Sequence, residues 1–443
     1  MPGTTLAGRL RLYICELDRN ISRAQDNGGS GKVKPTVLVA TTLRWFSTAR
    51  LMMALTDAGC IVKAVCTADH PLRTTSVAQE IYEYSGLYPV ESFAKAIERA
   101  KPDFIIPGDD LAVQHLHELY NLERSKGSAG DSTCALIERS LGDPKSFPIV
   151  YSRADFIHLA EEEGIRTPKT QMIANIRELR EWGARMGYPA VIKANGTWGG
   201  EGVRVVRSQR EAERAFRRLR KPPIAARVAK RVLLDRDTTL VWPFLTRRQN
   251  VVNAQAYVGG REATSLVVCS NGIVLAALHF EVLCKQSSNA PASVVRLIKD
   301  PDMISAAEKM VRRLNLTGFV GFDFMLEAQT GNAYLIEINS RPTQVGHLRL
   351  GPGRDLPAAM HAAMSGGVVG ETTKVTENDT IVFFPQEWLR NPVSPFLQSG
   401  YHDVPWEEPA LLRACLRKQR NWRSWFSQKE PSKAFLEARL PRP

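Results

Sequence analysis

A lysine and a glycine-rich loop lie between two short apolar segments near the middle of the chain. The pattern of Tyr188–Ala194, which contains Lys193, predicts a strand, and Val203–Arg207 is predicted to be the next one. A strand lysine can contact phosphate oxygens as a point charge, and glycines let backbone N–H groups approach phosphates closely. The loop joins two strands, which excludes a Walker-type P-loop and a Rossmann phosphate turn. The alternative is a flexible turn without a ligand. The residues expected at the phosphates are Lys193, Gly196, Thr197, Trp198, Gly199, Gly200 and Gly202.

A second group of polar residues alternates with apolar ones in a predicted hairpin. Gly318–Glu327 and Ala333–Arg341 are separated by a short loop that contains Gly331. If Glu327 pairs with Ala333, Asp323 lies opposite Glu337. One face is then apolar and must pack against protein, and the other holds the polar groups. The apolar face comprises Phe322, Phe324, Leu326, Tyr334, Ile336 and Ile338, and the polar face comprises Asp323, Glu337 and Asn339 beside Met325 and Leu335.

Two carboxylates on one face of a hairpin require a positive partner. At a separation of ~4 Å they would repel each other by about 4 kcal/mol near a protein surface. Oxygen ligands from Asp323, Glu337 and the Asn339 amide suit Mg²⁺, or Mn²⁺, with room left for phosphate oxygens. Arg341 is expected on the same face, where it would stabilise negative charge on a transferring phosphoryl group. The alternative is a structural ion cluster with arginine.

These residues need two structural units to position them. Short strands at Thr36–Thr42, Cys60–Cys66 and Pro102–Pro107 alternate with a helix at 47–58, which predicts a parallel, doubly wound, Rossmann-like α/β domain over residues 34–145. Gly108, Asp109 and Asp110 follow a strand end, where such sheets bind ligands. The two carboxylates there either bind substrate or form a turn. Residues 146–370 form the second unit, with a small lobe at about 165–245, and 371–443 form a basic extension of unknown role.

Bulk composition bounds the class of protein. The chain of 443 residues is 44% apolar and 24% charged, which is typical of a folded protein with more than one domain. No apolar run is long enough to cross a bilayer, and residues 1–33 are predicted to be a flexible leader. Seven cysteines form no close pair, which favours free thiols in a reducing cytoplasm over a zinc site or disulfides.

The net charge of +13 is concentrated in two segments. Arg204–Arg231 contains eleven basic and two acidic residues, and Leu411–Pro443 contains nine basic and two acidic residues. Each segment is either a solvated surface or an attractor of an anionic substrate or partner. Neither resembles a known nucleic-acid-binding module, so nucleic acid is not an expected partner.

In order and spacing, Lys193, the loop Gly196–Gly202, Asp323 and the motif Glu337-x-Asn339-x-Arg341 resemble the ATP-grasp superfamily. Its members include biotin carboxylase, carbamoyl phosphate synthetase and D-alanine–D-alanine ligase. The resemblance covers roughly residues 36–365 and implies a Rossmann-like domain followed by a two-lobed ATP-grasp domain. It implies that Lys193 and the loop hold the phosphates of ATP, and that Asp323, Glu337 and Asn339 bind Mg²⁺.

Three further positions are interpreted through this resemblance. Arg153 stands where many members carry a second lysine that contacts phosphate. Trp242 or Phe244 either covers the adenine or packs between the lobes. In Gln344–His347, which resembles a segment of biotin carboxylase, Gly346 replaces an acidic residue, and this argues against carboxylation of biotin.

The resemblance implies a ligase that converts a carboxylate to an acyl phosphate for attack by an amine, or less readily a thiol, with release of ADP and phosphate. Catalysis would rest on Arg341 and Lys193, and the partners would be small-molecule acids and amines. The sequence leaves open a monomer or a homo-oligomer. The alternatives are a carbamoyl-phosphate-type enzyme that activates bicarbonate and a nucleotide-binding regulatory or scaffold protein without turnover.

Overall fold

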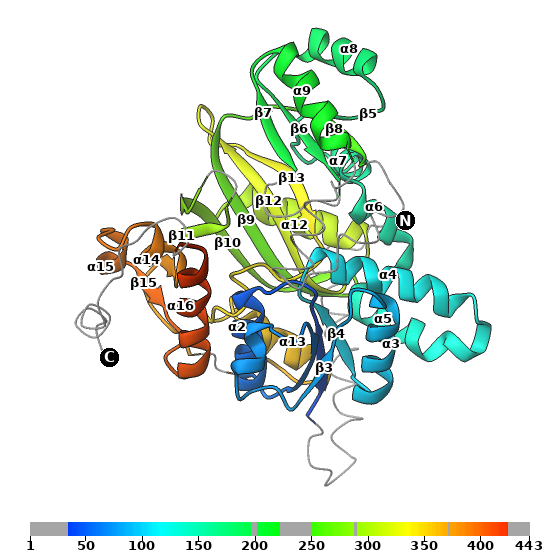
Figure 1. Ribbon diagram of the computed structural model, residues 1–443, viewed down its shortest axis with the longest axis vertical. Helices are drawn as coiled ribbons and strands as arrows, with labels where there is room; N and C mark the ends of the chain where they lie inside the picture. The colour runs from blue at the N-terminus through cyan, green and yellow to red at the C-terminus, as the bar shows by residue number, and fades with distance from the viewer. Residues whose placement is uncertain (1–33, 196–201, 222–249, 288–289, 371–372, 424–443) are drawn as a thin grey trace, which may run out of the picture. The chain divides into compact units, whose positions relative to one another are not determined.

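The structure, a computed structural model, describes residues 34–195, 202–221, 250–287, 290–370 and 373–423 (Figure 1). The described residues from Pro35 onwards belong to one compact unit.

The unit begins with a parallel four-stranded sheet whose order is β3-β2-β1-β4. Alternation along β1 explains why helices cover both of its faces. Val37 and Val39 pack with α2, whereas Leu38 and Ala40 pack with α3, α4 and α5. The predicted parallel, doubly wound arrangement is therefore confirmed. The strands are β1 (Thr36–Ala40), β2 (Ile61–Cys66), β3 (Glu80–Glu83) and β4 (Phe104–Pro107), and the helices are α2 (Phe46–Asp57), α3 (Pro89–Ala100), α4 (Asp110–Arg124) and α5 (Asp131–Leu141), with 3₁₀ turns at Pro71–Thr74, Gly127–Gly130 and Pro144–Ser146.

A small lobe follows, built on an antiparallel four-stranded sheet of order β5-β8-β6-β7. Two helices, α8 and α9, cover one face of this sheet, as the green segments of Figure 1 show. β6 and β7 are antiparallel neighbours, so the glycine-rich segment joins two strands as predicted. The elements of the lobe are β5 (Thr170–Ile173), α8 (Ile176–Met186), β6 (Ala190–Ala194), β7 (Val203–Val206), α9 (Gln209–Arg220) and β8 (Val252–Ala256). They are preceded by α6 (Phe147–Tyr151) and α7 (Arg153–Glu162), which pack with α12, β12 and β13 instead.

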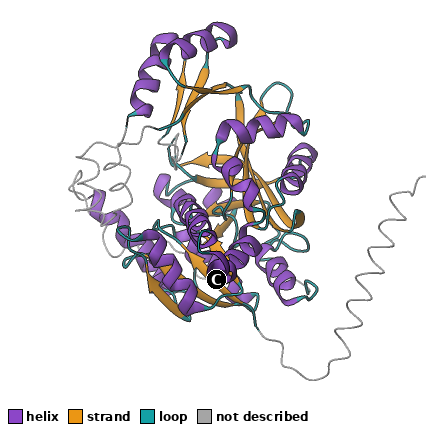
Figure 2. Ribbon diagram, turned by 90° about the vertical axis from the view of Figure 1, so that its right-hand side faces the viewer, coloured by secondary structure: helices purple, strands orange, loops and turns teal. Residues whose placement is uncertain are grey.

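The largest sheet has seven strands in the order β13-β12-β9-β10-β11-β14-β15. Each of its two faces packs against a different set of helices. Figure 2 shows the strands in orange and the helices in purple. Val267 and Phe322 pack on the α12 side, while Leu266 and Phe319 pack with α2 and α13 in a core shared with the first sheet. The elements are β9 (Gly260–Ser270), β10 (Ile273–Lys285), β11 (Ala292–Leu297), α12 (Pro301–Arg313), β12 (Gly318–Glu327), β13 (Ala333–Asn339) and α13 (Leu356–Ser365).

The C-terminal extension completes this sheet. β14 (Thr380–Phe383) pairs with β11, and β15 (Tyr401–Asp403) pairs with β14. Between and after them lie α14 (Gln386–Arg390), α15 (Phe396–Ser399) and α16 (Pro409–Arg423). Leu411 and Cys415 of α16 are buried in the same core as α2. Residues 380–415 are therefore an integral part of the fold.

Asp403 at the end of β15 joins three distant parts of the chain. Its buried carboxylate accepts a hydrogen bond from His347 Nε2 at 2.7 Å and forms an ion pair with Arg50 of α2. Burial alone would raise the pKa of Asp403, but His347 and Arg50 outweigh it and hold that pKa far below its usual range. The carboxylate is therefore ionised in the folded protein.

Asp403→Asn is expected to lower the free energy of unfolding by roughly 3 kcal/mol, because it removes the carboxylate that pairs with Arg50 and accepts the hydrogen bond from His347. Urea denaturation at neutral pH measures this loss. Asp379→Asn is the matched control, since Asp379 is exposed at the start of β14. Equal stability of the two variants would show that the three-part contact contributes nothing.

Two sequence-based expectations concern the class of protein. The six cysteines in the described part of the chain all carry free thiols, as predicted. Among the described helices, none combines the length and apolar character that crossing a membrane requires.

Candidate active site

The β12–β13 hairpin carries the predicted metal ligands, and a β-bulge determines which way they face. Asp323 lies opposite Glu337, as predicted, but Leu326 rather than Glu327 pairs with Ala333. The bulge lies between the pairs Phe324–Leu335 and Asp323–Glu337, and it leaves Ile336 without a partner.

The bulge corrects the predicted faces of the hairpin. Leu335 and Ala333 lie in the apolar core with Phe324, whereas Tyr334 was expected there and is instead half-buried against Arg166. Beyond the bulge the two strands pair in the predicted register, so Asp323 and Glu337 still lie opposite each other.

Asp323 lies in an environment that disfavours its ionised form. Burial raises the pKa of its carboxyl group, and the Glu337 carboxylate raises it further. Asn339 partly compensates by donating a hydrogen bond from Nδ2 to Asp323 Oδ2 at 3.0 Å. A cation between the two carboxylates would relieve this cost.

Lys193 projects from β6 towards the same carboxylates. Its side chain is buried, and it forms no hydrogen bond or ion pair within the described residues. Burial lowers the pKa of its ammonium group to about 8, although the Glu337 carboxylate acts in the opposite direction. A buried ammonium group is costly unless an anion lies close to it.

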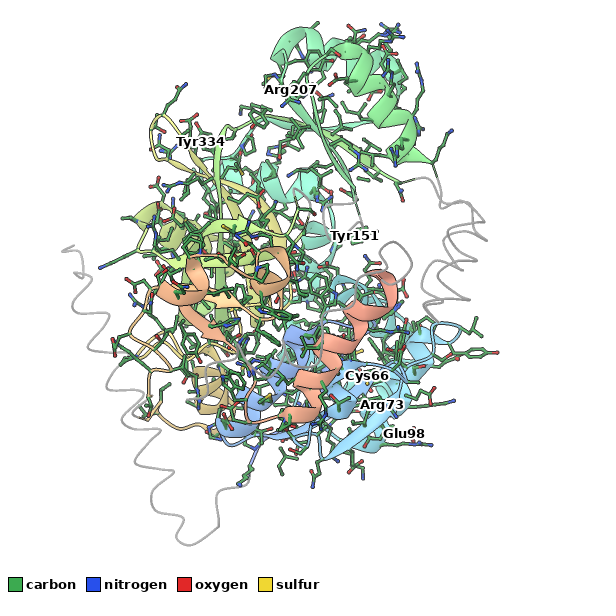
Figure 3. All side chains as sticks on the ribbon, turned by 60° about the vertical axis from the view of Figure 1, so that its left-hand side comes forward. Cys66, Arg73, Glu98, Tyr151, Arg207 and Tyr334 are labelled. Carbon is green, nitrogen blue, oxygen red and sulfur yellow. The ribbon has the colours of Figure 1, made fainter. Side chains whose placement is uncertain are left out.

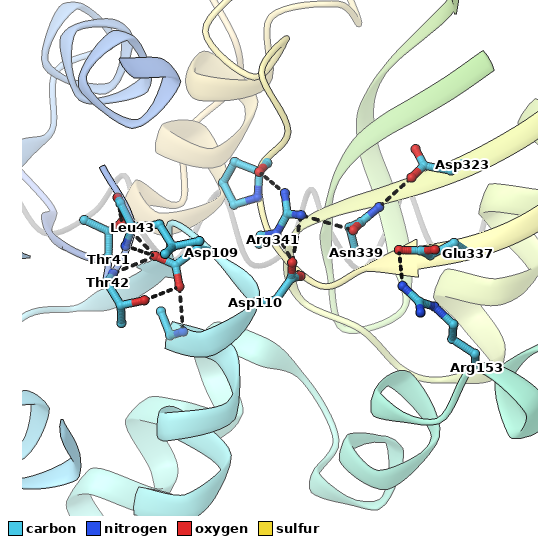
Figure 4. Close-up of polar contacts among 12 residues, drawn as sticks. Thr41, Thr42, Leu43, Asp109, Asp110, Arg153, Asp323, Glu337, Asn339 and Arg341 are labelled. Atoms are coloured by element: carbon cyan, nitrogen blue, oxygen red, sulfur yellow. Dashed lines mark hydrogen bonds and ion pairs between the residues drawn. The ribbon is translucent and has the colours of Figure 1, made fainter. Parts of the chain in front are cut away.

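Arg153 connects the small lobe with the hairpin. It occupies the first position of α7, after the N-cap Ser152, and it donates hydrogen bonds to the Ala194 carbonyl oxygen and to Glu337 Oε1, the latter at 3.2 Å. The end of β6, the start of α7 and β13 therefore meet at this guanidinium group, and Figure 4 shows its contact with Glu337.

Arg341 lies beyond the end of β13 rather than on the strand face. Its Nε and Nη2 donate to the two carboxylate oxygens of Asp110 at 2.8 and 2.9 Å, and Nη2 also donates to Asn339 Oδ1 at 3.2 Å. Asp110 outweighs the effect of burial and raises the pKa of the guanidinium group. The result is a continuous series of contacts from Asp110 through Arg341 and Asn339 to Asp323, drawn in Figure 4.

The neighbouring Asp109 has a structural role. Its buried carboxylate caps α4 by accepting a hydrogen bond from the Ala112 N–H at 2.9 Å. It also accepts hydrogen bonds from both threonine hydroxyls of Thr41 and Thr42, each at 2.8 Å. Of the two alternatives for this acidic pair, Asp109 takes the turn-forming one, and Asp110 is the residue that reaches the candidate site.

A cavity of about 70 Å³ borders this site, enclosed by one side of α4, by α6 and α7, and by the end of β13. Gln114, His117 and Ser340 contribute polar groups to it, and sequence reasoning did not identify them. His117 stacks on Phe147 with 3.8 Å between ring centroids, and burial lowers its pKa to about 4, so it is neutral at pH 7. The i, i+4, i+7 spacing of Asp110, Gln114 and His117 was the available signal, since it places three polar residues on one face of α4.

The donor set at the hairpin fits a hard divalent cation. Within the described residues there is no group of three or more His, Cys, Asp or Glu side chains that could hold a metal ion. Two carboxylates and an amide are available, however, and burial together with the nearby Glu337 carboxylate raises the pKa of Asp323, a cost that a bound cation would offset. Phosphate and water oxygens would complete such a coordination shell.

Several predicted nucleotide contacts lie outside the described residues, namely Gly196, Thr197, Trp198, Gly199, Gly200, Trp242 and Phe244. Gly202 is described and buried at the start of β7, where its carbonyl oxygen accepts a hydrogen bond from the Ala194 N–H at 2.9 Å. In Gln344–His347, Gln344 donates to the Ala292 carbonyl oxygen at 3.2 Å, and His347 is held by Asp403.

The raised pKa of Asp323 predicts a pH dependence of stability in the ligand-free protein. The folded state holds this proton more tightly than the unfolded chain, so stability should fall as the pH rises above about 4, the ordinary pKa of aspartate. Asp323→Asn removes this dependence and should be more stable than the parent at pH 7, by on the order of 2 kcal/mol. The loss in the parent should be complete slightly above pH 6, since burial raises the pKa of Asp323 to about 6. Thermal unfolding from pH 4 to 7 measures it, and parallel profiles of the two proteins would contradict the assignment.

Residues 152–348 match a family described as the ATP-binding domain of the carbamoyl-phosphate synthase L chain. A biotin carboxylase from Haemophilus influenzae is 25% identical over 306 residues, which are 67% of this chain and 63% of that protein. The match therefore spans less than two thirds of the length of this relative.

Two solved structures share the fold. The biotin carboxylase domain of the 2-oxoglutarate carboxylase from Hydrogenobacter thermophilus, in complex with MgADP, ADP and bicarbonate, has a TM-score of 0.54 at 17% identity, over 77% of this chain and 72% of that one. N5-carboxyaminoimidazole synthase from Aspergillus clavatus, in complex with ADP and 5-aminoimidazole ribonucleotide, has a TM-score of 0.55 at 14% identity, over 76% of this chain and 78% of that one.

Proposed function

Because the chain belongs to the ATP-grasp superfamily, we propose that it is an ADP-forming ligase that activates a carboxylate with ATP for attack by an amine. The observation that carries this proposal is the convergence of five side chains from four elements. Lys193 of β6, Arg153 of α7, Asp323 of β12, and Glu337 and Asn339 of β13 surround one site, as their hydrogen bonds and mutual electrostatic effects on pKa indicate.

The proposed roles follow from charge and position. Lys193 and Arg153 would bind the phosphates of ATP. Asp323, Glu337 and Asn339 would hold Mg²⁺, which neutralises charge on the phosphates when bound. In the first step a carboxylate oxygen attacks the γ-phosphorus, the bond to ADP breaks, and an acyl phosphate forms. In the second step an amine attacks the acyl carbon, loses a proton and displaces phosphate.

Arg341 would stabilise the negative charge that develops on the transferring group. Its bidentate pair with Asp110 fixes the guanidinium plane, so we assign Asp110 as a positioning residue for Arg341. Asp110 belongs to the first sheet's α4, and Arg341 follows the hairpin. The site is thus assembled only when the two parts of the fold pack together.

The proposed location of the enzyme is the cytoplasm, which the free thiols support because a reducing compartment preserves them. Bicarbonate belongs among the candidate acid substrates because the H. thermophilus domain was solved with it.

The test is release of ADP from ATP·Mg²⁺ in the presence of pooled small carboxylic acids, bicarbonate and amines, followed by mass spectrometry of the product. The expected result is ADP formation that depends on both an acid and an amine. Formation of carbamoyl phosphate from bicarbonate would instead identify the carbamoyl-phosphate-type alternative.

One observation favours the scaffold alternative. In this structure Arg153 is paired with Glu337 and Arg341 with Asp110, so both arginines already have carboxylate partners. A nucleotide-binding protein without turnover would retain such pairs. Saturable ATP binding without ADP release under any substrate pool would support that alternative and contradict the ligase.

A further inference from the structure

The outer surface of the small lobe carries a row of arginines on α9. Arg210, Arg214 and Arg218 are all exposed and are spaced four residues apart, which places them on one face of the helix in successive turns. We call these three residues the arginine stripe. Arg207, Arg217 and Lys221 flank it, and Arg207 is labelled on this lobe in Figure 3.

The stripe lacks internal countercharges. None of its three guanidinium groups forms an ion pair or hydrogen bond with any residue that the structure describes. Glu213 of the same helix is taken by Arg180 and Arg217, at 2.8 and 3.0 Å. Glu211 is the other acidic residue of α9, and its carboxylate accepts a hydrogen bond from the Arg207 backbone N–H at 2.8 Å.

The stability of the fold does not account for this arrangement. A positive charge in the last turn, such as that of Arg218, interacts favourably with the helix dipole. Arg210 lies in the first turn, where the interaction of a positive charge with the dipole is unfavourable. Like charges four residues apart also repel each other. The helix is held by its buried face, which contains Ala212 and Phe216, and this face needs no arginine opposite it.

The stripe is also separate from the candidate active site. Ile192 and Ala194 of β6 pack in the core beneath α9, so Lys193 between them projects from the other face of the sheet. Met172 and Val205, exposed apolar side chains of this lobe, share the face of Lys193 through the strand register. They are therefore not part of the stripe.

We propose that the arginine stripe binds the phosphate groups of a nucleic-acid backbone without reading its base sequence. Arginine presents a planar fork of donors that matches phosphate oxygens. The stripe extends about 12 Å along the helix, the rise of roughly four nucleotides of one strand of B-form DNA. Expectation from the sequence was against nucleic acid because no known module is present, and the geometry of α9 provides a reason to revise it.

Two other classes of macromolecule fit the stripe less well. A protein interface usually has an apolar core, and Arg210, Arg214 and Arg218 surround no exposed apolar residue of α9, whose apolar residues are buried. A membrane-bound amphipathic helix inserts its apolar face into lipid, whereas that face of α9 forms the core of the lobe.

The test is binding of the full chain to short labelled duplex DNA of random sequence over a range of salt concentrations. The triple variant R210Q/R214Q/R218Q is expected to bind at least about tenfold more weakly at low salt and to reduce the slope of log K against log salt by about 2 to 3. The matched control R99Q/R312Q/R354Q removes the same charge from exposed arginines outside α9 and should bind like the parent.

R210K/R214K/R218K preserves charge and helix propensity, so it separates a binding defect from misfolding. It should retain the salt slope and lose part of the affinity, because the fork is absent. An unchanged slope in the folded glutamine variant, or an equal loss in the control, would overturn the proposal. If poly-glutamate binds as tightly as DNA, the stripe recognises negative charge in general and the phosphate assignment is overturned. If inorganic polyphosphate binds and DNA does not, the phosphate ligand comes from another source and the nucleic-acid proposal is overturned. ATP turnover of the triple variant should equal that of the parent.

Discussion

Glu337→Gln should lower ATP turnover by about a thousandfold or more while the protein remains folded. The substitution keeps the shape of the side chain but removes a charge from the proposed metal site and the partner of Arg153 at 3.2 Å. Loss of about 4 kcal/mol of transition-state stabilisation corresponds to this reduction. Steady-state release of ADP, measured at saturating Mg²⁺, is the readout.

The control for this variant is Glu327→Gln at the far end of the same hairpin. Glu327 is half-buried and accepts a hydrogen bond from the hydroxyl of Thr330 at 2.6 Å, outside the candidate site. The Glu327→Gln variant should retain the ATP turnover of the parent protein. The metal assignment fails if Glu337→Gln keeps near-parental turnover, or if both variants lose activity to the same extent.

Lys193→Met should weaken ATP binding about a hundredfold and at the same time stabilise the ligand-free protein. Burial lowers the pKa of this lysine from 10.5 to about 8, which corresponds to roughly 3 kcal/mol of cost for the charged form at neutral pH. Methionine fills similar volume without that cost. Loss of function accompanied by a gain in stability is the pattern expected of a residue retained for its ligand.

The pH dependence of stability provides a second readout for the same variant. The unfolded chain binds the lysine proton more tightly than the folded protein does, so the parent should gain stability as the pH rises from about 8 towards 10.5. Lys193→Met should lack this gain. Isothermal titration with ATP·Mg²⁺ and urea denaturation at pH 7 and 9 measure both effects. Unchanged ATP affinity would reduce Lys193 to an ordinary strand residue.

The first sheet could be predicted because its signals are local. Strand and helix patterns alternate over short distances, and right-handed connections leave few arrangements for such a series. The pairing of Asp323 with Glu337 was also predictable, since the loop between the strands is short. The bulge was not, because Tyr334, Leu335 and Ile336 are three consecutive apolar residues, and an alternating pattern cannot show which of them is the extra one.

Contacts between distant segments left no comparable signal. Asp110 and Arg341 are 231 positions apart, and nothing near either residue indicates its partner. The addition of β14 and β15 to the edge of the large sheet was equally hidden, since short apolar strands do not specify their neighbour. The excess charge of Arg204–Arg231 was visible in the sequence, but its alignment on one face of α9 required the helix to be in place.

The ion pair between Arg50 and Asp403 has a consequence for synthesis on the ribosome. The two residues are 353 positions apart, and Leu411 of α16 is buried in the core that also holds α2. At about 5–20 residues per second, α2 emerges roughly 20–70 s before the segment that covers it. Until that segment emerges, the core around α2 lacks the residues that α16 contributes, which makes the nascent chain a candidate client for chaperones that bind during elongation.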